Sequence, residues 1–387
     1  MVTRILPLLA ALLLIPVYFI DRRFLRGRVG RWWRVAFCGI NVILFLALAC
    51  LAWNESYTAT ADYLKGRTLN VALLVSVPET LFALIAVPRA RLWRTRLALG
   101  LSSVLFLAMA YAMTLGWRQI TTRETTLAYS SLPKGFDGYR IVQISDLHLG
   151  TMCGHEDVVE ELVERVNILK PDLIVFTGDL VNYLPQELEK FIPILSKMKA
   201  RDGVVSVLGN HDYLGYYAWE SEKEQRDAVH QLMAMQDAMG WRLLNNESLV
   251  LRSGDTRDSI VVVGLENDGP PRFPALADWD KATRGISDES FRILVQHDPS
   301  YWRREVLNHE RPPQLQLSGH THAMQFSIFG WSPSSLMFDE WGGLYKDESH
   351  AETYIYVTQG FGSVLMPFRL GAWPEIALIT LERTKNN

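Results

Sequence analysis

The chain has 387 residues, of which 49% are hydrophobic and 21% are charged, and its formal net charge is −3 at pH 7. Three cysteines without an evident pairing imply no disulfide framework. Charge is distributed unevenly, because residues 1–120 hold 14 basic and 4 acidic residues and the remainder holds 25 basic and 38 acidic ones. Nucleic-acid binding depends on neutralisation of phosphates by Lys and Arg, so the acidic remainder argues against a nuclease and no nucleic-acid partner is expected.

Four apolar runs within the first 120 residues predict an N-terminal bundle of four transmembrane helices. Three runs contain 19 to 21 residues, enough to span a hydrocarbon core of about 30 Å at about 1.5 Å per residue. The first run is shorter and contains Pro7 and Pro16, and we interpret it as an uncleaved span, with a signal-peptide core as the alternative. The predicted spans are 5–20, 35–53, 69–87 and 97–117.

Arginine-rich loops predict the orientation of this bundle. Six arginines lie between the first and second runs and four between the third and fourth, whereas the remaining loop holds only Lys65 and Arg67. By the positive-inside rule the arginine-rich loops are cytoplasmic. Four spans then place both termini and the C-terminal domain on the outer, periplasmic face of a bacterial inner membrane. A cytoplasmic C-terminal domain would require one span to be miscounted.

Glu79 follows Pro78 and is the one ionisable residue inside a predicted span. A carboxylate inside a membrane is costly, so one interpretation gives it a function, such as holding a polar headgroup or carrying protons. The alternative interpretation pairs Glu79 with Asn41 or a backbone group inside the bundle.

Residues 121–138 are polar and rich in Thr and Ser, and we predict that they form a linker to a C-terminal domain over 139–387. In that domain, apolar residues recur with helical spacing in Glu156–Leu169, Gln186–Lys199 and Gln225–Met239. Short β-branched runs alternate with these helical patterns and then follow one another more closely. The order indicates mixed βα units followed by β-rich units.

Five polar clusters, each directly after an apolar run typical of a buried strand, form a candidate metal-ligand set. The runs are Arg140–Ser145, Leu173–Thr177, Val204–Leu208, Phe291–Gln296 and Gln314–Ser318. Because loops at strand ends converge in layered α/β domains, five such ends can pool their side chains at one point. The clusters are Asp146-Leu-His148, Gly178-Asp179, Gly209-Asn210-His211-Asp212, His297 and Gly319-His320-Thr321-His322.

Each cluster taken alone has an ordinary structural explanation. Gly-Asp after a strand is common, since Gly supplies a positive φ and Asp caps the following helix. The joint occurrence of all five, in this order, favours a metal site. Carboxylate, imidazole and amide donors suit borderline divalent metals, and there are enough of them for two ions.

The order Asp-x-His, Gly-Asp, Gly-Asn-His-Asp, His and Gly-His-x-His resembles the calcineurin-like metallophosphoesterase superfamily. The resemblance covers about 139–381. The stretches Ser145–Gly150, Leu243–Glu247 and Pro367–Gly371 are similar to a membrane-associated bacterial phosphodiesterase-like branch. The resemblance implies an α/β metallophosphoesterase domain that follows the transmembrane bundle in the sequence and is built as a sandwich of two β-sheets flanked by helices.

The resemblance also implies a role for each residue of the clusters. His211 is not a ligand in this family and is the candidate general acid or transition-state stabiliser, with Asp212 as a residue that orients it. Ala323-Met324-Gln325 departs from the Gly-Gly-Gln that close relatives carry after the last His, so substrate preference transfers less safely than chemistry. The implied ligands are Asp146, His148 and His322 for one metal, Asn210, His297 and His320 for the other, and Asp179 as the bridge.

The implied cofactors are two divalent ions, Mn, Fe or Zn. Two such cations about 3.5–4 Å apart would clamp a bridging water, lower its pKa and deliver hydroxide in line to phosphorus. The predicted function is a membrane-anchored dinuclear phosphoesterase acting on phosphodiesters or lipid headgroups. The alternatives are a general phosphomonoesterase and a membrane sensor or scaffold with a vestigial phosphoesterase domain, which the complete ligand set disfavours.

Two aromatic and apolar stretches, Phe326–Tyr345 and Phe361–Trp373, flank the last ligand motif. Loops of this kind beside a metal site could lie in the membrane interface, where Trp is favoured, and admit a lipid-linked phosphoester from the bilayer. The alternative is that their side chains cover the core of the enzyme itself.

Overall fold

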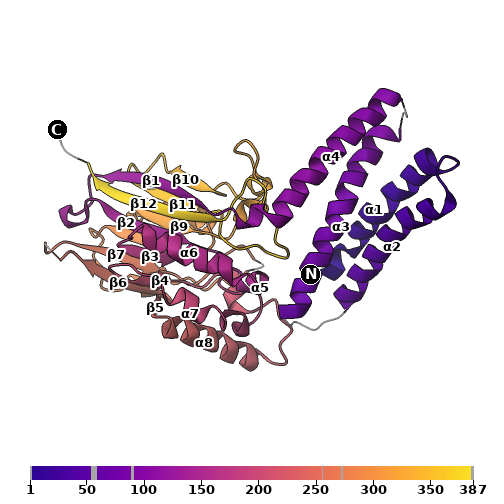
Figure 1. Cartoon of the computed structure of the whole chain (residues 1–387). Helices are drawn as coiled ribbons and strands as arrows, with labels where there is room; N and C mark the ends of the chain where they lie inside the picture. The colour runs from indigo at the N-terminus through magenta and orange to yellow at the C-terminus, as the bar shows by residue number, and fades with distance from the viewer. Residues whose placement is uncertain (1, 54–58, 89–90, 255, 272, 385–387) are drawn as a thin grey trace. The chain divides into compact units, whose positions relative to one another are not determined.

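The computed structural model describes residues 2–53, 59–88, 91–254, 256–271 and 273–384 (Figure 1). The chain divides into two compact units. The helical unit comprises Met1–Trp117 together with Leu365–Leu370. The other unit comprises Arg118–Val364 together with Gly371–Asn387, and we call it the catalytic unit after the activity that the sequence predicts.

The helical unit contains the predicted four helices, but fewer predicted spans. Three helical segments of the described residues are long and apolar enough to cross a bilayer: Arg31–Leu51, Leu64–Ala86 and Leu92–Arg118. The first predicted span is a 19-residue helix that carries two prolines and is not among these three, so the four-span prediction exceeds the structure by one. The helices are α1 (Val2–Ile20), α2 (Arg31–Trp53), α3 (Ala59–Ala86) and α4 (Leu92–Thr114).

Residues Leu365–Leu370 form a short strap that belongs to the helical unit although it lies late in the sequence. Met366 of the strap packs against the buried cluster of the bundle, which includes Leu13 and Leu69. Asn70 Nδ2 donates to the Pro367 carbonyl oxygen at 3.2 Å, and the Arg369 amide donates to the Ala112 carbonyl oxygen at 3.2 Å. The strap is therefore held by both α3 and α4.

Within the bundle, Asn41 is 1% exposed and its Nδ2 lies 3.5 Å from Glu79 Oε1. The structure thus brings together the two residues that the second interpretation of Glu79 pairs. A buried amide beside the carboxylate lowers the cost of placing Glu79 among apolar side chains.

The catalytic unit is built on two six-stranded sheets. One sheet has the order β1-β12-β2-β3-β4-β5, in which β2, β3, β4 and β5 are parallel, and the other has the order β10-β11-β9-β8-β7-β6. The strands are β1 (Thr121–Tyr129), β2 (Tyr139–Ile144), β3 (Leu173–Phe176), β4 (Val204–Ser206), β5 (Trp241–Leu243), β6 (Glu247–Arg252), β7 (Ser259–Gly264), β8 (Arg292–Val295), β9 (Leu315–Ser318), β10 (Gly343–Lys346), β11 (Tyr354–Val357) and β12 (Glu375–Arg383).

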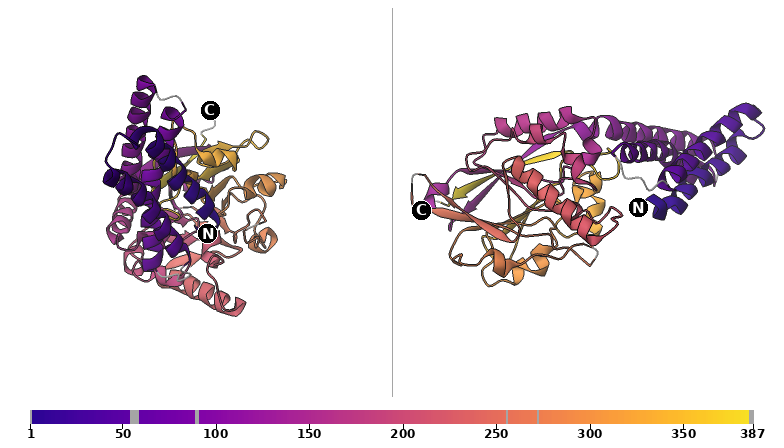
Figure 2. Two further views of the ribbon diagram at one scale, coloured as in Figure 1. Left: turned by 90° about the vertical axis from the view of Figure 1, so that its right-hand side faces the viewer. Right: turned by 90° about the horizontal axis from the view of Figure 1, so that it is seen from below.

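The main core lies between these sheets, where side chains such as Ile141 and Val175 of the first meet Val262 and Ile293 of the second. Figure 2 shows this unit from two further directions, with helices on the outside of its strands. The two-sheet α/β architecture is the one predicted. The helices of this unit are α5 (Leu149–Met152), α6 (Glu156–Ile168), α7 (Ile192–Leu195), α8 (Glu222–Ala238), α9 (Trp279–Ala282) and α10 (Tyr301–Arg304).

Two predicted segments differ from the structure. Residues 121–138, expected to be a linker, form β1 and a 3-10 turn, because Leu127 and Tyr129 are buried and the strand pairs along its whole length with β12. The helix expected over Gln186–Lys199 is broken into a 3-10 turn and the single turn α7. Pro193 has no backbone N–H to donate within a longer helix.

Candidate metal centre

The five predicted clusters follow parallel strands of both sheets. Asp146, Asp179 and Asn210 follow β2, β3 and β4 of the first sheet, and the other two clusters follow β8 and β9 of the second. All five strands lie within the five runs expected from the sequence or differ from them by one residue at an end. The two sheets therefore point their carboxyl ends at one place, as the strand-end argument requires.

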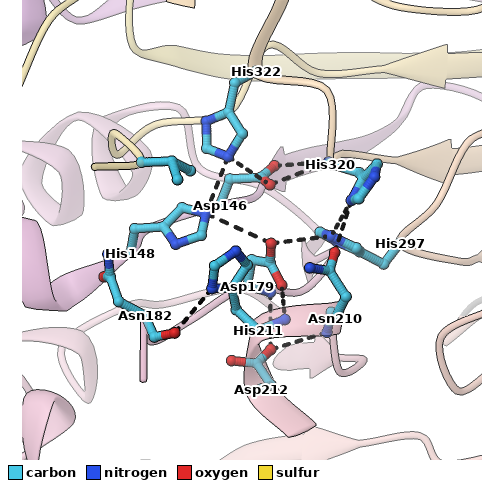
Figure 3. Close-up of polar contacts among 12 residues, drawn as sticks. Asp146, His148, Asp179, Asn182, Asn210, His211, Asp212, His297, His320 and His322 are labelled. Atoms are coloured by element: carbon cyan, nitrogen blue, oxygen red, sulfur yellow. Dashed lines mark hydrogen bonds and ion pairs between the residues drawn. The ribbon is translucent and has the colours of Figure 1, made fainter. Parts of the chain in front are cut away.

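The first group of possible ligands consists of Asp146, His148, Asp179 and His322, all buried, with one donor atom of each within 4.8 Å of the others. His322 Nε2 lies 3.2 Å from Asp146 Oδ1. His148 Nε2 lies 3.0 Å from His322 Nε2 and 3.5 Å from Asp179 Oδ2. Figure 3 shows these side chains converging from separate loops.

The second group shares Asp179 with the first and adds His297 and His320. His297 Nε2 lies 3.2 Å from Asp179 Oδ2 and 3.3 Å from His320 Nδ1. Asn210 completes this group, because its Oδ1 lies 2.8 Å from His320 Nδ1. One carboxylate oxygen, Asp179 Oδ2, therefore faces imidazoles of both groups.

The burial of so many polar groups sets their charge states. Burial favours the neutral ring of His297, but the Asp179 carboxylate, helped by Asp146 and the Thr177 carbonyl, raises the pKa of His297 to about 10. Burial likewise opposes ionisation of Asp179, yet its imidazole neighbours, His297 foremost, hold its pKa well below the usual range. Burial and nearby His211 hold the pKa of His148 well below its ordinary value, which leaves a lone pair on the ring for a cation.

Many of these residues also have unusual backbone conformations. A left-handed backbone costs a non-glycine residue about 1–3 kcal/mol, so a concentration of such residues indicates that a site dictates the backbone shape. The ligand candidates with positive φ are Asp146 (55°), His148 (44°), Asp179 (60°), His320 (73°) and His322 (50°).

His211 lies at the edge of the cluster and is half-buried. Its Nδ1 lies 2.9 Å from the Asn182 carbonyl oxygen, so the Nδ1 proton is donated there and Nε2 is left for a ligand. The ring stacks on Tyr216 at a centroid distance of 4.3 Å, and its backbone amide donates to Asp179 Oδ1. His211 is therefore positioned by Asn182 and Tyr216.

Asp212 does not contact the His211 ring through any of its hydrogen bonds. Its carboxylate accepts backbone N–H bonds from Asp179, Leu180, Val181 and Gly209 at 2.8–3.2 Å. These hydrogen bonds join the Asp179 loop to the Asn210 loop, and an effect of Asp212 on the orientation of His211 stays a prediction. Burial, followed by the Asp179 charge, raises the pKa of Asp212 to about 7.

Three contacts at the site involve groups that the sequence reasoning missed. The hydroxyl of Tyr216 accepts a hydrogen bond from Asn210 Nδ2 at 2.9 Å, which turns Oδ1 of the amide toward His320. Asp298 Oδ2 lies 3.7 Å from His320 Nε2, on the side of the ring opposite to Asn210. The third is the carbonyl of Asn182, which no side-chain pattern could have indicated.

The arrangement fits divalent metal ions. Two imidazole nitrogens 3.0 Å apart, each beside a carboxylate, are candidate ligands that converge on a common point. The Nδ1 proton of His297 is donated to the Thr177 carbonyl at 2.8 Å, which turns Nε2 inward, and outer hydrogen bonds of this kind orient metal-binding histidines. Imidazole, carboxylate and amide donors are the set that borderline divalent metals prefer.

Comparisons with known proteins agree with this geometry. A family model described as calcineurin-like phosphoesterase matches residues 139–324. The uncharacterized metallophosphoesterase YkuE of Bacillus subtilis (strain 168) is 33% identical over 280 residues, which cover 71% of this chain and 90% of that protein. The chain belongs to the calcineurin-like phosphoesterase family. It is thus a metal-dependent phosphoesterase.

Two further relatives extend the picture. A transmembrane protein with metallophosphoesterase domain from Danio rerio is 32% identical over 67% of this chain, and the chain covers 57% of its length. An uncharacterized metallophosphoesterase of Aquifex aeolicus (strain VF5) is 27% identical over 69% of this chain and 94% of that protein. With its own three candidate spans, the chain is a membrane protein of this family.

Proposed function

We propose that the chain is a membrane-anchored, dinuclear phosphoesterase that hydrolyses phosphodiesters. The observation that carries the proposal is the position of Asp179, whose Oδ2 lies 3.5 Å from His148 Nε2 and 3.2 Å from His297 Nε2. Two groups of ligands that share one carboxylate oxygen fit a pair of ions, which is an arrangement used for displacement at phosphorus.

In this proposal each of the seven ligand side chains has a defined place. When bound, divalent ions supply Lewis acidity, because they lower the pKa of water and offset charge on the phosphoryl oxygens. Mixed nitrogen and oxygen ligands favour Mn, Fe or Zn over Mg, which prefers oxygen ligands and retained waters. One ion would be held by Asp146, His148 and His322, the other by Asn210, His297 and His320, and both by Asp179.

His211 would act on the substrate itself. Since its Nδ1 proton is directed to Asn182, Nε2 is the atom that can give a proton to the leaving oxygen or hydrogen-bond a phosphoryl oxygen. Stacking on Tyr216 keeps the ring from rotating away. Hydrolysis by this route would require no covalent intermediate between the substrate and the protein.

The charge of the chain favours a diester over a monoester. A monoester dianion brings more negative charge than a diester, and residues 121–387 hold 25 basic against 38 acidic residues to meet it. The same balance disfavours nucleic acid, whose binding depends on many phosphate contacts. A small or lipid-borne phosphodiester fits this unit better than either.

The catalytic unit is placed outside the cytoplasm in this proposal, in a bacterial inner membrane. The arginine-rich loop before α4 is cytoplasmic by the positive-inside rule. The last candidate span, Leu92–Arg118, then crosses the membrane to the outer face. If the first predicted span does not cross the membrane, the N-terminus lies in the cytoplasm but the catalytic unit still lies outside. Three spans and four spans therefore give the same location for the catalytic unit. Arg89 of that loop lies outside the described residues. Reporter fusions after residue 384 that are active in the periplasm alone would agree with this placement.

The decisive experiment uses the full chain in detergent, stripped of metal and then reloaded separately with Mn, Fe, Zn or Mg. Bis-aryl phosphodiester, aryl phosphomonoester and phospholipid are offered in parallel. We expect diester hydrolysis that disappears on stripping, returns with Mn, Fe or Zn, and reaches its maximum at two ions per chain.

Two results would contradict the proposal. Maximal turnover at one ion per chain would remove the dinuclear assignment. Monoester hydrolysis well above diester hydrolysis under every metal would favour the phosphomonoesterase alternative instead.

A further inference from the structure

The catalytic unit exposes large apolar side chains at few places. Among the described residues of this unit eleven such side chains are exposed, and six of them lie within the fifteen residues 324–338. We call this segment the platform. Its exposed side chains are Met324 (41%), Ile328 (48%), Phe329 (101%), Trp331 (47%), Leu336 (78%) and Met337 (61%).

The platform has the reverse of the usual polarity of a water-facing loop. Three of its five polar residues, Gln325, Ser332 and Ser334, are buried, at 8%, 0% and 0% exposure, whereas Ser327 is half-buried and Ser335 is exposed. Ser332 Oγ donates to the Ala323 carbonyl at 2.6 Å, and Ser334 Oγ donates to the Thr321 carbonyl at 3.3 Å. Small polar groups therefore fix the backbone from inside, while the large apolar groups point outward. This argues against the alternative that these side chains cover the enzyme's own core.

The most exposed residue stands on a tight turn. Ile328 and Trp331 exchange two backbone hydrogen bonds at 2.9 and 3.0 Å, which leaves Phe329 and Gly330 at the tip. Both tip residues have positive φ, 50° and 78°, as a two-residue hairpin turn requires. A bulky residue such as Phe is conformationally strained at positive φ, so the aromatic ring at this tip lowers the stability of the fold.

A second costly choice lies at the base of the platform. Ala323 and Met324 have φ of 49° and 45°, a region in which glycine is unstrained. The sequence has side chains at both positions, and that of Met324 is exposed. The whole segment 324–338 also contains no charged residue.

The platform is attached directly to the metal centre. His322 immediately precedes its base, and the ring of Phe338 at its other end meets the His320 ring edge-on at 5.6 Å. A group that engages the platform is therefore delivered beside ligands of the proposed second ion.

The base of the platform is also hydrogen-bonded to the residue that precedes the strap. Gln325 Oε1 accepts the Val364 amide at 2.5 Å, and Val364 is the last residue before the strap. The strap itself packs within the bundle of candidate spans. An uncharged apolar surface on a chain that is anchored in a membrane has the bilayer available as an apolar partner.

We propose that residues 324–338 insert into the acyl region of the bilayer and that the substrate is a phosphoester of a membrane lipid, drawn from the leaflet to the metal centre. The substrate assignment rests on the proposed function, whereas the insertion does not. Because the platform is uncharged, its insertion depends little on ionic strength, unlike binding through basic residues.

The insertion is tested on the full chain in nanodiscs, with Cys38, Cys50 and Cys153 replaced by Ser. A bimane label is placed at Phe329→Cys and, as the matched control, at Ile168→Cys, an apolar residue of α6 that is 75% exposed and has no exposed apolar neighbours in sequence. Lipids with spin labels on the acyl chain should quench position 329 about twofold or more and leave position 168 unchanged, since interfacial side chains lie about 5–10 Å deep.

Equal quenching at the two positions would overturn the insertion. Quenching of position 329 only by a spin-labelled second copy of the chain would also overturn it, because the occupant would then be another protein molecule.

The substrate arm compares Phe329→Ser/Leu336→Ser/Met337→Ser with the control Ile168→Ser/Val250→Ser/Leu276→Ser, all exposed apolar residues of the same unit. We expect the platform variant to lose about tenfold in phospholipid turnover, as removal of buried apolar anchors does. Its turnover of soluble bis-aryl diester should be unchanged. Equal loss on both substrates would overturn the lipid assignment. If the unaltered protein hydrolyses neither substrate, the proposed function fails, and the quenching result still decides the insertion.

Discussion

The two units of this chain use exposed apolar side chains in opposite ways. Of the 37 large apolar side chains exposed among the described residues, 26 belong to the helical unit. There the alanines Ala72, Ala98 and Ala112 are fully buried while Leu84 and Leu107 are 68% and 65% exposed, as expected for helices that pack through small residues in lipid. In the catalytic unit apolar residues fill the space between sheets, and the platform is the concentrated exception. Exposure therefore has to be judged against the solvent that each part meets.

The comparison also separates the buried polar groups of the two units. The buried candidate ligands of the catalytic unit converge on one point, whereas Asn41 and Glu79 of the helical unit pair with each other away from it. We therefore expect hydrolysis to depend on the first set and not on the second.

The largest effect is expected for Asp179→Asn. The change removes the carboxylate that faces both ligand groups, so metal content and turnover should fall together, with turnover lower by about 10³-fold, the scale of losing a full electrostatic stabiliser. Metal analysis and diester turnover of the same preparation measure it. Asn41→Leu is the control in the helical unit and should keep both values. Loss of turnover in the control would show that the bundle takes part in the chemistry.

His211→Ala should separate metal binding from proton transfer. The ring lies beside the ligands but its Nδ1 is directed to Asn182, so the metals should remain while turnover falls by about 10²-fold or more, the usual contribution of a general acid. The fall should be smaller for a bis-aryl diester with a good leaving group than for an alkyl diester. Loss of metal in this variant would make His211 a ligand, and the acid assignment would be wrong.

Asp298→Asn should have a smaller effect, confined to one ligand group. Asp298 Oδ2 faces Nε2 of His320, and carboxylates that hold a ligand histidine typically change metal affinity by about 10–100-fold. Titration of stripped protein with Co(II), followed by absorption, should show one weakened ion and one unaffected ion. Asp268→Asn, a carboxylate of the neighbouring loop paired with Arg304, is the control. Equal weakening of both ions would mean that Asp298 supports the unit as a whole.

Much of the candidate centre could be predicted because its candidate ligands are encoded locally. Each candidate ligand follows a β-branched run, and the structure brings all seven side chains together from the ends of five parallel strands. The residues that position the ligands could not be found in this way. Tyr216 and Asp298 act through contacts with loops distant in sequence, and Asn182 contributes only a carbonyl that every residue possesses.

The errors in the fold have a related cause. Residues 121–138 are too polar to be recognised as containing a strand, since Leu127 and Tyr129 are the two residues of β1 that are buried, and the pairing partner β12 lies more than 240 residues later. The strap illustrates the same limit. Nothing within Leu365–Leu370 indicates that these residues leave one unit and pack in the other, because the evidence is in their partners Asn70 and Ala112.

The smallest expected effect is for Gly66→Ala, which tests how the strap packs on α3. A Cβ at this position would come within 2.6 Å of the Leu365 carbonyl oxygen, a backbone atom that cannot move aside alone. Ordinarily Gly→Ala inside a helix stabilises it by about 1 kcal/mol. At Gly66 the crowding should cost about 1–3 kcal/mol instead and loosen the strap.

Hydrogen exchange of the Arg369 amide, which donates to Ala112, measures this loosening. Gly100→Ala in α4 is the matched control, since nothing lies within 4 Å of its added Cβ. Faster exchange in the Gly66 variant alone, with metal content unchanged, is the expected result. Slower or equal exchange would mean that the strap does not rest on α3. If turnover of lipid then falls while that of soluble diester is kept, the strap contributes to holding the catalytic unit at the bilayer.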